Sequence, residues 1–270
     1  MNYKLISMDF DGTLLTSEKI ITQNTKRVLE ILKNNGYYIV GVTGRNINSA
    51  KSVCDLKMFN YLILNNGAFI YDVKKDNAEN IGGLDEKLQK EIFNHFKDKS
   101  YAIDFCSYDK YFMYRKVIDE SKKFLVKIND LNDINEPICR INIFADDSLI
   151  DEYYTYLINK YSDKANIFIM KDSDDASNLR WIAIIPKNIN KGIAIEKLCN
   201  KLNIKLDECM FFADGPNDIE ALDIVGLGIA MDNAFEEVKR YADDITLSND
   251  KEGIAVYLRN KFNIKIWYKY

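Results

Sequence analysis

Residues 3–13, YKLISMDFDGT, form a short apolar segment that ends abruptly in two acids. Residues 5–8 are typical of a buried strand, and Asp9 and Asp11 follow where that strand ends. Two carboxylates so close together raise each other's pKa and repel. A cation, a helix N-terminus or water must offset that repulsion. The stretch therefore predicts a buried strand that delivers acidic groups to its carboxyl end.

Strand and helix patterns alternate on both sides of this stretch, which is typical of a parallel α/β sheet with right-handed crossovers. The sequence predicts helices over 22–36, 45–57 and 192–202, and strands over 37–44, 61–67, 68–72, 209–214, 226–231 and 243–248. In such sheets, ligands bind outside the carboxyl ends of the strands. The polar residues at those ends are therefore the candidates for a functional site.

Residues 84–186 follow a different pattern. Amphipathic helices are predicted over 84–98 and 148–161, between aromatic-rich strands over 110–117, 139–145, 166–171 and 181–186. A segment of about a hundred residues can form its own domain. We expect an α/β core of residues 1–83 and 187–270, interrupted by an α+β module of residues 84–186. Gly82-Gly83 and Pro186-Lys187 are candidate hinges, although ordinary turn chemistry explains the Gly-Gly pair equally well.

The composition narrows the function classes. Charged residues make up 29% of the 270 residues. The formal net charge of −4 argues against non-specific electrostatic binding of nucleic acid. The five cysteines form no C-x-x-C pair, which argues against zinc and favours reduced thiols. No signal-peptide pattern or run of 18 apolar residues occurs, so we expect a cytoplasmic protein without a membrane partner. The single histidine, His95, fits a surface helix position, and catalysis built on Ser-His-Asp or Cys-His is not expected.

Polar residues follow four of the predicted strands. They are Asp9 and Asp11 with Gly12 and Thr13, then Thr43-Gly44-Arg45, then Asn65-Asn66-Gly67, and finally Asp214, Asn217 and Asp218 in ADGPND. If these strands are neighbours, three or four carboxylates converge at one edge of the sheet. A hard divalent cation bound by these carboxylates would offset their mutual repulsion. Mg²⁺ suits a site with few protein carboxylates.

Each element also has a purely structural interpretation. Asp218 follows Gly215 and Pro216, which fit an N-cap and a first helical position, so its charge would favour the helix N-terminus in any case. Thr43-Gly44 could form only a turn, and the two acids of the first motif could be turn formers.

Lys191 is more informative. It lies near the beginning of a predicted helix, where a cation opposes the helix dipole. A lysine in that place serves a nearby anion, such as the carboxylates or a bound phosphate, or else is a solvated surface residue. Lys187 is a weaker competitor for the same role.

The motifs DFDGT, VTGR, NNGA, NKG and ADGPND occur together in the order and approximate spacing of one family. The chain resembles the haloacid dehalogenase-like (HAD) phosphohydrolases, most closely the Cof-type subfamily, whose cap is inserted after the third strand. The resemblance implies a Rossmann-like parallel sheet core with an inserted α+β cap that determines substrate choice. One departure is Ala213, where the family usually has glycine; we expect a slight positional effect.

The resemblance also implies roles for individual residues. Asp9 would be the nucleophile that forms an aspartyl-phosphate, and Asp11 the general acid and base. Mg²⁺ would be bound by Asp9, the backbone carbonyl of Asp11 and Asp214, with Asp218 and Asn217 in support. The expected contacts to the transferring phosphoryl group are Thr43 and Lys191, and those to the substrate are Gly44, Arg45, Asn66 and Asn217. Asp11 needs a proton at neutral pH, and we expect the neighbouring carboxylate to raise its pKa.

These inferences predict a Mg²⁺-dependent phosphatase, acting on small phosphorylated metabolites such as sugar phosphates, as a monomer or weak homo-oligomer. Two alternatives stay open. One is a phosphomutase on the same scaffold, and the other is a non-catalytic regulatory protein that binds a phosphorylated metabolite.

Overall fold

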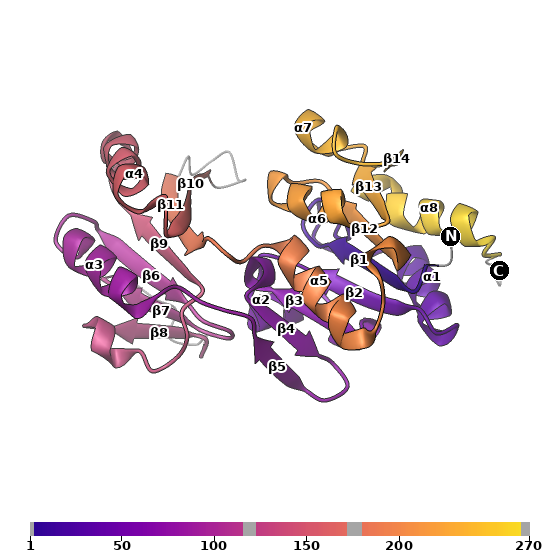
Figure 1. Ribbon diagram of the computed structural model, residues 1–270, viewed down its shortest axis with the longest axis horizontal. Helices are drawn as coiled ribbons and strands as arrows, with labels where there is room; N and C mark the ends of the chain where they lie inside the picture. The colour runs from indigo at the N-terminus through magenta and orange to yellow at the C-terminus, as the bar shows by residue number, and fades with distance from the viewer. Residues whose placement is uncertain (1–2, 116–122, 172–179, 266–270) are drawn as a thin grey trace. The chain divides into compact units, whose positions relative to one another are not determined.

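The computed structural model describes residues 3–115, 123–171 and 180–265, and the chain divides into two compact units (Figure 1). The core unit comprises Met1–Arg45, Ser49–Glu79 and Asn190–Tyr270. The inserted unit comprises Asn46–Asn48 and Asn80–Ile189. The domain boundaries expected at residues 84 and 186, and the function of the inserted unit as a cap, stay predictions.

An eight-stranded sheet of order β14-β13-β12-β1-β2-β3-β4-β5 forms the centre of the core unit. Its strands are β1 (Leu5–Asp9), β2 (Tyr38–Val42), β3 (Tyr61–Leu64), β4 (Phe69–Asp72), β5 (Asn77–Asn80), β12 (Cys209–Ala213), β13 (Leu227–Met231) and β14 (Asp244–Thr246). Neighbouring strands from β14 to β3 pair in parallel, and β4 pairs antiparallel to β3. The predicted α/β fold with a parallel sheet is confirmed.

Helices flank this sheet, with α1 packing on α8 and α5 on α6. Their bounds are α1 (Gln23–Asn34), α2 (Ile47–Lys51), α5 (Lys191–Leu202), α6 (Ile219–Ile224), α7 (Glu236–Lys239) and α8 (Gly253–Phe262). The helix predicted over 45–57 is shorter than expected. After α2 the chain turns, and the Asp55 side chain caps a new 3₁₀ turn, Leu56–Met58, by accepting from Lys57 N at 3.0 Å. Helix α8 had no counterpart in the sequence prediction.

Strand β1 lies between β12 and β2, so the strands that precede the polar motifs are neighbours. Residues 5–8 are fully buried, and the Ser7 hydroxyl donates to the Met210 carbonyl at 2.8 Å. Met8 pairs with Phe212 in β12, and Asp9 pairs with Val42 in β2. This register brings the carboxyl ends of the three strands to one edge of the sheet, as the sequence predicted.

The inserted unit contains a six-stranded sheet of order β10-β11-β9-β6-β7-β8. Its strands are β6 (Ala102–Cys106), β7 (Tyr111–Tyr114), β8 (Leu125–Ile128), β9 (Arg140–Phe144), β10 (Ala165–Lys171) and β11 (Arg180–Pro186), and its helices are α3 (Glu86–Phe96) and α4 (Asp147–Tyr161). The helices share one hydrophobic core with one face of the sheet (Figure 1). Strands β6 and β8 were not predicted. Residues 116–117 of the strand predicted over 110–117 lie outside the described residues.

The segments that enter and leave the inserted unit lie side by side. A Cβ added to Gly82 would lie 2.6 Å from Ile189 Cδ1. His95 lies on α3, half-buried, and its ring stacks on Tyr156 with centroids 4.0 Å apart. Within the described residues, no helix is both long and apolar enough to cross a bilayer.

Candidate active site

Lys191 is a buried cation near the carboxyl ends of the core unit's strands. It is the first residue of α5 and 1% exposed, and the Asn190 side chain caps that helix by accepting from Ile193 N at 2.8 Å. Its Nζ donates to Asp9 Oδ1 at 2.6 Å and to Asp218 Oδ1 at 2.5 Å. The surface-lysine interpretation is therefore wrong. Lys187 donates instead to the Ser162 carbonyl at 2.5 Å, within the inserted unit.

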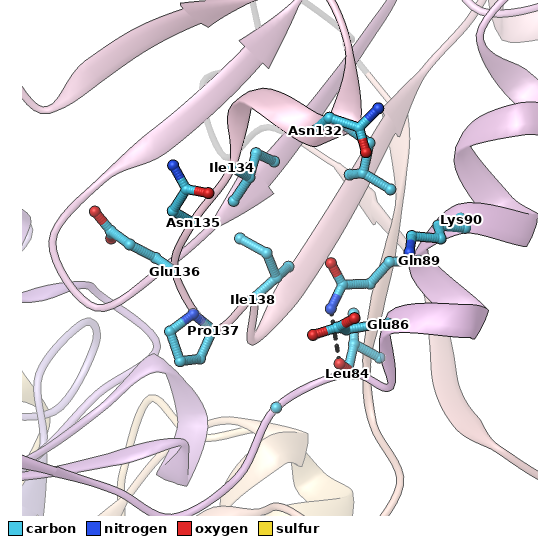
Figure 2. Close-up of a pocket in the computed structure, with 12 residues that line it drawn as sticks. Leu84, Glu86, Gln89, Lys90, Asn132, Ile134, Asn135, Glu136, Pro137 and Ile138 are labelled. Atoms are coloured by element: carbon cyan, nitrogen blue, oxygen red, sulfur yellow. Dashed lines mark hydrogen bonds between the residues drawn. The ribbon is translucent and has the colours of Figure 1, made fainter.

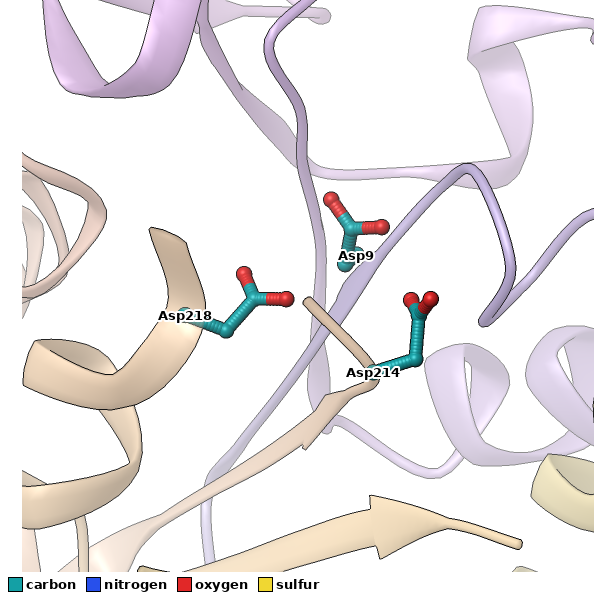
Figure 3. A group of neighbouring side chains, drawn as sticks. All are labelled: Asp9, Asp214 and Asp218. Carbon is teal, nitrogen blue, oxygen red and sulfur yellow. The ribbon is translucent and has the colours of Figure 1, made fainter. Parts of the chain in front are cut away.

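Three carboxylates form a cluster here, and two of them contact this ammonium. One carboxylate oxygen from each of Asp9, Asp214 and Asp218 lies within 4.8 Å of the others, and Figure 3 shows the groups turned toward a common space. Asp218 also accepts from Gly215 N at 3.1 Å. It therefore caps the start of its own short helical turn and also belongs to the carboxylate cluster. Two ligand oxygens of an octahedral Mg²⁺ lie up to about 4.2 Å apart. The spacing therefore suits a small divalent cation after a slight contraction.

The charges of this cluster favour a cation as well. Three ionised carboxylates and one ammonium sum to a formal −2, which one divalent ion balances. Burial raises the pKa of Asp9 to about 8, opposed by Lys191 and reinforced by Asp218 and Asp214. Burial likewise raises the pKa of Asp214 to about 6. Fully ionised, the cluster would carry more negative charge than the lysine stabilises, and its donor set fits Mg²⁺.

Gly12 and Thr13 shape the space around Asp214. Gly12 has φ +81°, a conformation that glycine adopts readily, and a Cβ there would collide with the Asp214 carboxylate. Thr13 Oγ1 donates to Asp214 Oδ1 at 2.6 Å. The glycine and the hydroxyl therefore position this carboxylate. Thr13 was not predicted to be functional, although its place in the first motif was the available signal.

Asp11 differs from the sequence expectation. Arg45 donates to both of its oxygens, through Nε and Nη2 at 2.7 Å each, and Lys19 Nζ donates at 3.0 Å. Although partial burial opposes it, these hydrogen bonds hold the pKa of Asp11 below its ordinary value. The expected upward shift of this pKa is therefore wrong for this structure, because two cations stabilise the carboxylate. The sequence offered no signal for Lys19.

Thr43, Gly44, Asn66 and Asn217 lie together at the ends of β2 and β3. The Thr43 hydroxyl accepts from Arg45 N at 3.1 Å, and Asn66 N donates to the Thr43 carbonyl at 3.0 Å. Asn217 Nδ2 donates to Asn66 Oδ1 at 3.1 Å. A Cβ on Gly44 would lie 3.0 Å from that same Asn66 oxygen. An accepting hydroxyl keeps its own hydrogen for another acceptor, so Thr43 can still donate to an anion.

The inserted unit has a cavity of its own, of about 670 Å³. Figure 2 shows α3 contributing Glu86, Gln89 and Lys90 on one side and the 131–138 segment on the other. Gln89 Nε2 donates to the Leu84 carbonyl at 2.7 Å. No residue of the acidic cluster is among those that line it.

Comparisons with known proteins match nearly the whole chain. The family model of haloacid dehalogenase-like hydrolases matches residues 6–258. Two Bacillus subtilis proteins named 5-amino-6-(5-phospho-D-ribitylamino)uracil phosphatase are each 26% identical, the first over 96% of this chain and 98% of its own, the second over 96% of both. A haloacid dehalogenase-like hydrolase from Bacteroides thetaiotaomicron superposes with a TM-score of 0.84 at 25% identity, covering 97% of this chain and all of the other.

Proposed function

The chain belongs to the haloacid dehalogenase-like hydrolases, and from that premise we propose that it hydrolyses small phosphorylated metabolites with Mg²⁺ bound at the acidic cluster. The observation that carries the proposal is the cluster of Asp9, Asp214 and Asp218, in which Asp9 and Asp218 are buried and paired with Lys191. Burying so much charge is costly unless a ligand compensates it. A divalent cation bound at the cluster would supply that compensation.

We propose the following chemistry for these groups. An Asp9 oxygen attacks phosphorus, the ester P–O bond breaks, and the leaving alkoxide takes a proton from Asp11. Water then attacks the aspartyl-phosphate, giving its proton to Asp11 and releasing inorganic phosphate and Asp9. Lys191 and Thr43 donate to the phosphoryl oxygens. When bound to Asp9, Asp214 and Asp218, Mg²⁺ supplies positive charge that stabilises those oxygens in the transition state.

Arg45 has a further role in this proposal. Its guanidinium makes a two-pronged contact with the Asp11 carboxylate, and the same fork fits a phosphate group. We propose that the substrate phosphate competes for Arg45. Release of Asp11 from this partner removes hydrogen bonds that favour its ionised form, so Asp11 can hold the proton that the leaving group needs.

The names of the two Bacillus subtilis relatives suggest a substrate type. Both act, by name, on a uracil ring that bears a phosphorylated ribityl chain. We propose phosphate monoesters of polyhydroxylated carbon chains, sugar phosphates included, as the substrates of this chain.

The test is a phosphate-release screen over sugar phosphates, nucleotides, and flavin and pyridoxal phosphates, with Mg²⁺ or with EDTA. Asp9→Asn serves as the control, because it keeps the shape of the side chain and removes the nucleophile. We expect turnover only with Mg²⁺ and a loss of several decades in Asp9→Asn. Wild-type turnover by Asp9→Asn would refute its role as nucleophile.

Two other outcomes identify the alternatives. Isomerisation of a sugar phosphate supplied with its bisphosphate, without phosphate release, would indicate a phosphomutase. Tight binding of phosphate esters by folded, Mg²⁺-loaded protein without any turnover would indicate a regulatory binding protein.

A further inference from the structure

The loop that follows β13 in the core unit contacts two segments of the candidate active site. This loop, residues 232–235, joins β13 to α7. Asn233 Nδ2 donates to the Gly12 carbonyl at 2.8 Å. Phe235 N donates to the Asp214 carbonyl at 3.2 Å. One short loop therefore contacts the chain just after β1 and just after β12, beside two carboxylates of the acidic cluster.

The Asn233 side chain is exposed, yet its amide has a single orientation. The Gly12 carbonyl can only accept a hydrogen bond, so the amide nitrogen must face it. The amide oxygen accepts from Asn249 N at 3.0 Å, and a backbone N–H can only donate. Reversing the amide would therefore break both hydrogen bonds. Asn233 is thus held in the orientation that contacts the Gly12 carbonyl.

The peptide bond between Gly12 and Thr13 links this contact to the acidic cluster. Its carbonyl accepts from Asn233, and its N–H donates to the Phe10 carbonyl at 3.4 Å. Because a peptide is planar, contacts at both of its ends fix its orientation and thereby the point from which the Thr13 side chain extends. Thr13 Oγ1 donates to Asp214 Oδ1 at 2.6 Å. Two hydrogen bonds joined by one peptide therefore connect Asn233 to a carboxylate of the cluster.

The 3₁₀ turn Asn249–Lys251 holds the same loop at two further points. Asn249 Nδ2 donates to the Leu15 carbonyl at 2.9 Å. The Asp250 carboxylate accepts from Ser17 N at 2.8 Å and from Ser17 Oγ at 2.7 Å. These contacts hold the part of the loop that follows the DFDGT motif, whereas Asn233 contacts the motif itself.

We propose that Asn233 is a positioning residue for the Mg²⁺ site. Acting through the peptide between Gly12 and Thr13, it restricts the Asp214 carboxylate to positions from which that group can bind the ion. The inference rests on the proposed function, which requires Mg²⁺ at the acidic cluster. A carboxylate that is restricted in advance loses less conformational entropy when the ion binds, so the ion binds more tightly. Removing a group that holds a metal ligand commonly lowers metal affinity about 10–100-fold.

Asn233→Ala tests this role, because it removes both hydrogen bonds of the side chain. Asn35→Ala is the matched control. Asn35 is also exposed, and its Nδ2 also donates to a backbone carbonyl, that of Ile31, at 2.7 Å. It precedes β2 and therefore lies at the opposite edge of the core sheet from the acidic cluster. The measurements are Mg²⁺ affinity by calorimetric titration and the melting temperature in EDTA.

We expect Asn233→Ala to bind Mg²⁺ about 10-fold more weakly than wild type, and Asn35→Ala to bind it within about twofold of wild type. Both variants should melt within about 4 °C of wild type, since each loses only surface hydrogen bonds. A purely structural role would lower the melting temperature without a selective loss of Mg²⁺ affinity. Equal Mg²⁺ affinities for the two variants would overturn the inference.

A double variant tests the connection through Thr13. Thr13→Val removes the hydroxyl that contacts Asp214, which is the last contact between Asn233 and the cluster in this chain of interactions. If Asn233 acts through that hydroxyl, the double variant Thr13→Val, Asn233→Ala should bind Mg²⁺ about as weakly as Thr13→Val alone. A further loss of about 10-fold in the double variant would contradict the proposed connection.

Calorimetry also separates this inference from the proposed function, because it requires no turnover. If Asn233→Ala shows the selective loss of Mg²⁺ affinity but wild type hydrolyses no ester, the positioning role is supported and the proposed phosphatase function fails. If wild type hydrolyses esters with Mg²⁺ and Asn233→Ala matches its Mg²⁺ affinity, the positioning role fails and the proposed function stands. Absence of Mg²⁺ binding by folded wild type would refute the positioning role together with the proposed metal dependence.

Discussion

Replacing Lys191 by methionine tests the central feature of the core unit. Methionine has a similar length and no charge, so the variant removes the ammonium and largely keeps the packing. Lys191 is 1% exposed, and its two hydrogen bonds to Asp9 and Asp218 measure 2.6 and 2.5 Å. The variant therefore leaves two buried carboxylates without their cation.

The expected loss follows from that burial. Breaking a buried ion pair by removing one partner costs about 3–5 kcal/mol, because an uncompensated charge remains. Each kcal/mol lowers the melting temperature of a protein of this size by about 2–4 °C. We therefore expect a drop of between about 6 and 20 °C at pH 7.

Thermal melts in EDTA at pH 7 measure this effect. Lys187→Met is the matched control: Lys187 is exposed, and its Nζ bonds only a carbonyl among the contacts described, so we expect a change of about 2 °C or less. A loss for Lys191→Met no larger than that of the control would refute the reasoning. Turnover should fall at least 100-fold in the same variant.

Three further outcomes are expected. Both Asp214 and Asp9 have pKa values raised from 3.8, to about 6 and about 8, so the metal-free fold holds protons that the unfolded chain releases. Its stability should therefore fall as pH rises from 5 to 9 in EDTA, and Mg²⁺ should reverse that trend; a rise in EDTA would contradict it. Gly12→Ala should abolish Mg²⁺-dependent turnover and destabilise more than Gly36→Ala, which has a similar φ of +89° but open space at its Cβ. Thr13→Val should weaken Mg²⁺ binding about 10-fold by calorimetry, whereas Thr13→Ser should retain it.

The sequence predicted the parts of the site that follow directly from strand order. Asp9, Thr43 and Asp214 come next to one another because β1 lies between β2 and β12, and the alternating pattern already implied such neighbours. The position of Lys191 at the start of a helix also indicated a lysine that contacts a nearby anion. We find all four where the strand ends meet.

Side-chain partners set by loop conformation were not predictable. The contacts of Arg45 and Lys19 to Asp11 depend on the path of the loop after β1, where Gly12 and Lys19 both have positive φ. Strand β6 was missed because Asp104 interrupts its apolar pattern. That carboxylate has a partner in Asn142 on the adjacent strand, which only the three-dimensional register reveals.

The closeness of Gly82 to Ile189 has an evolutionary consequence. The chain leaves and re-enters the core unit through two adjacent segments, as it would through an ordinary surface loop. An insertion attached in this way can lengthen, shrink or be exchanged by recombination while the ends of the core sheet stay where they are. Proteins descended from one ancestral core could therefore come to differ in their substrates while inheriting the same catalytic residues.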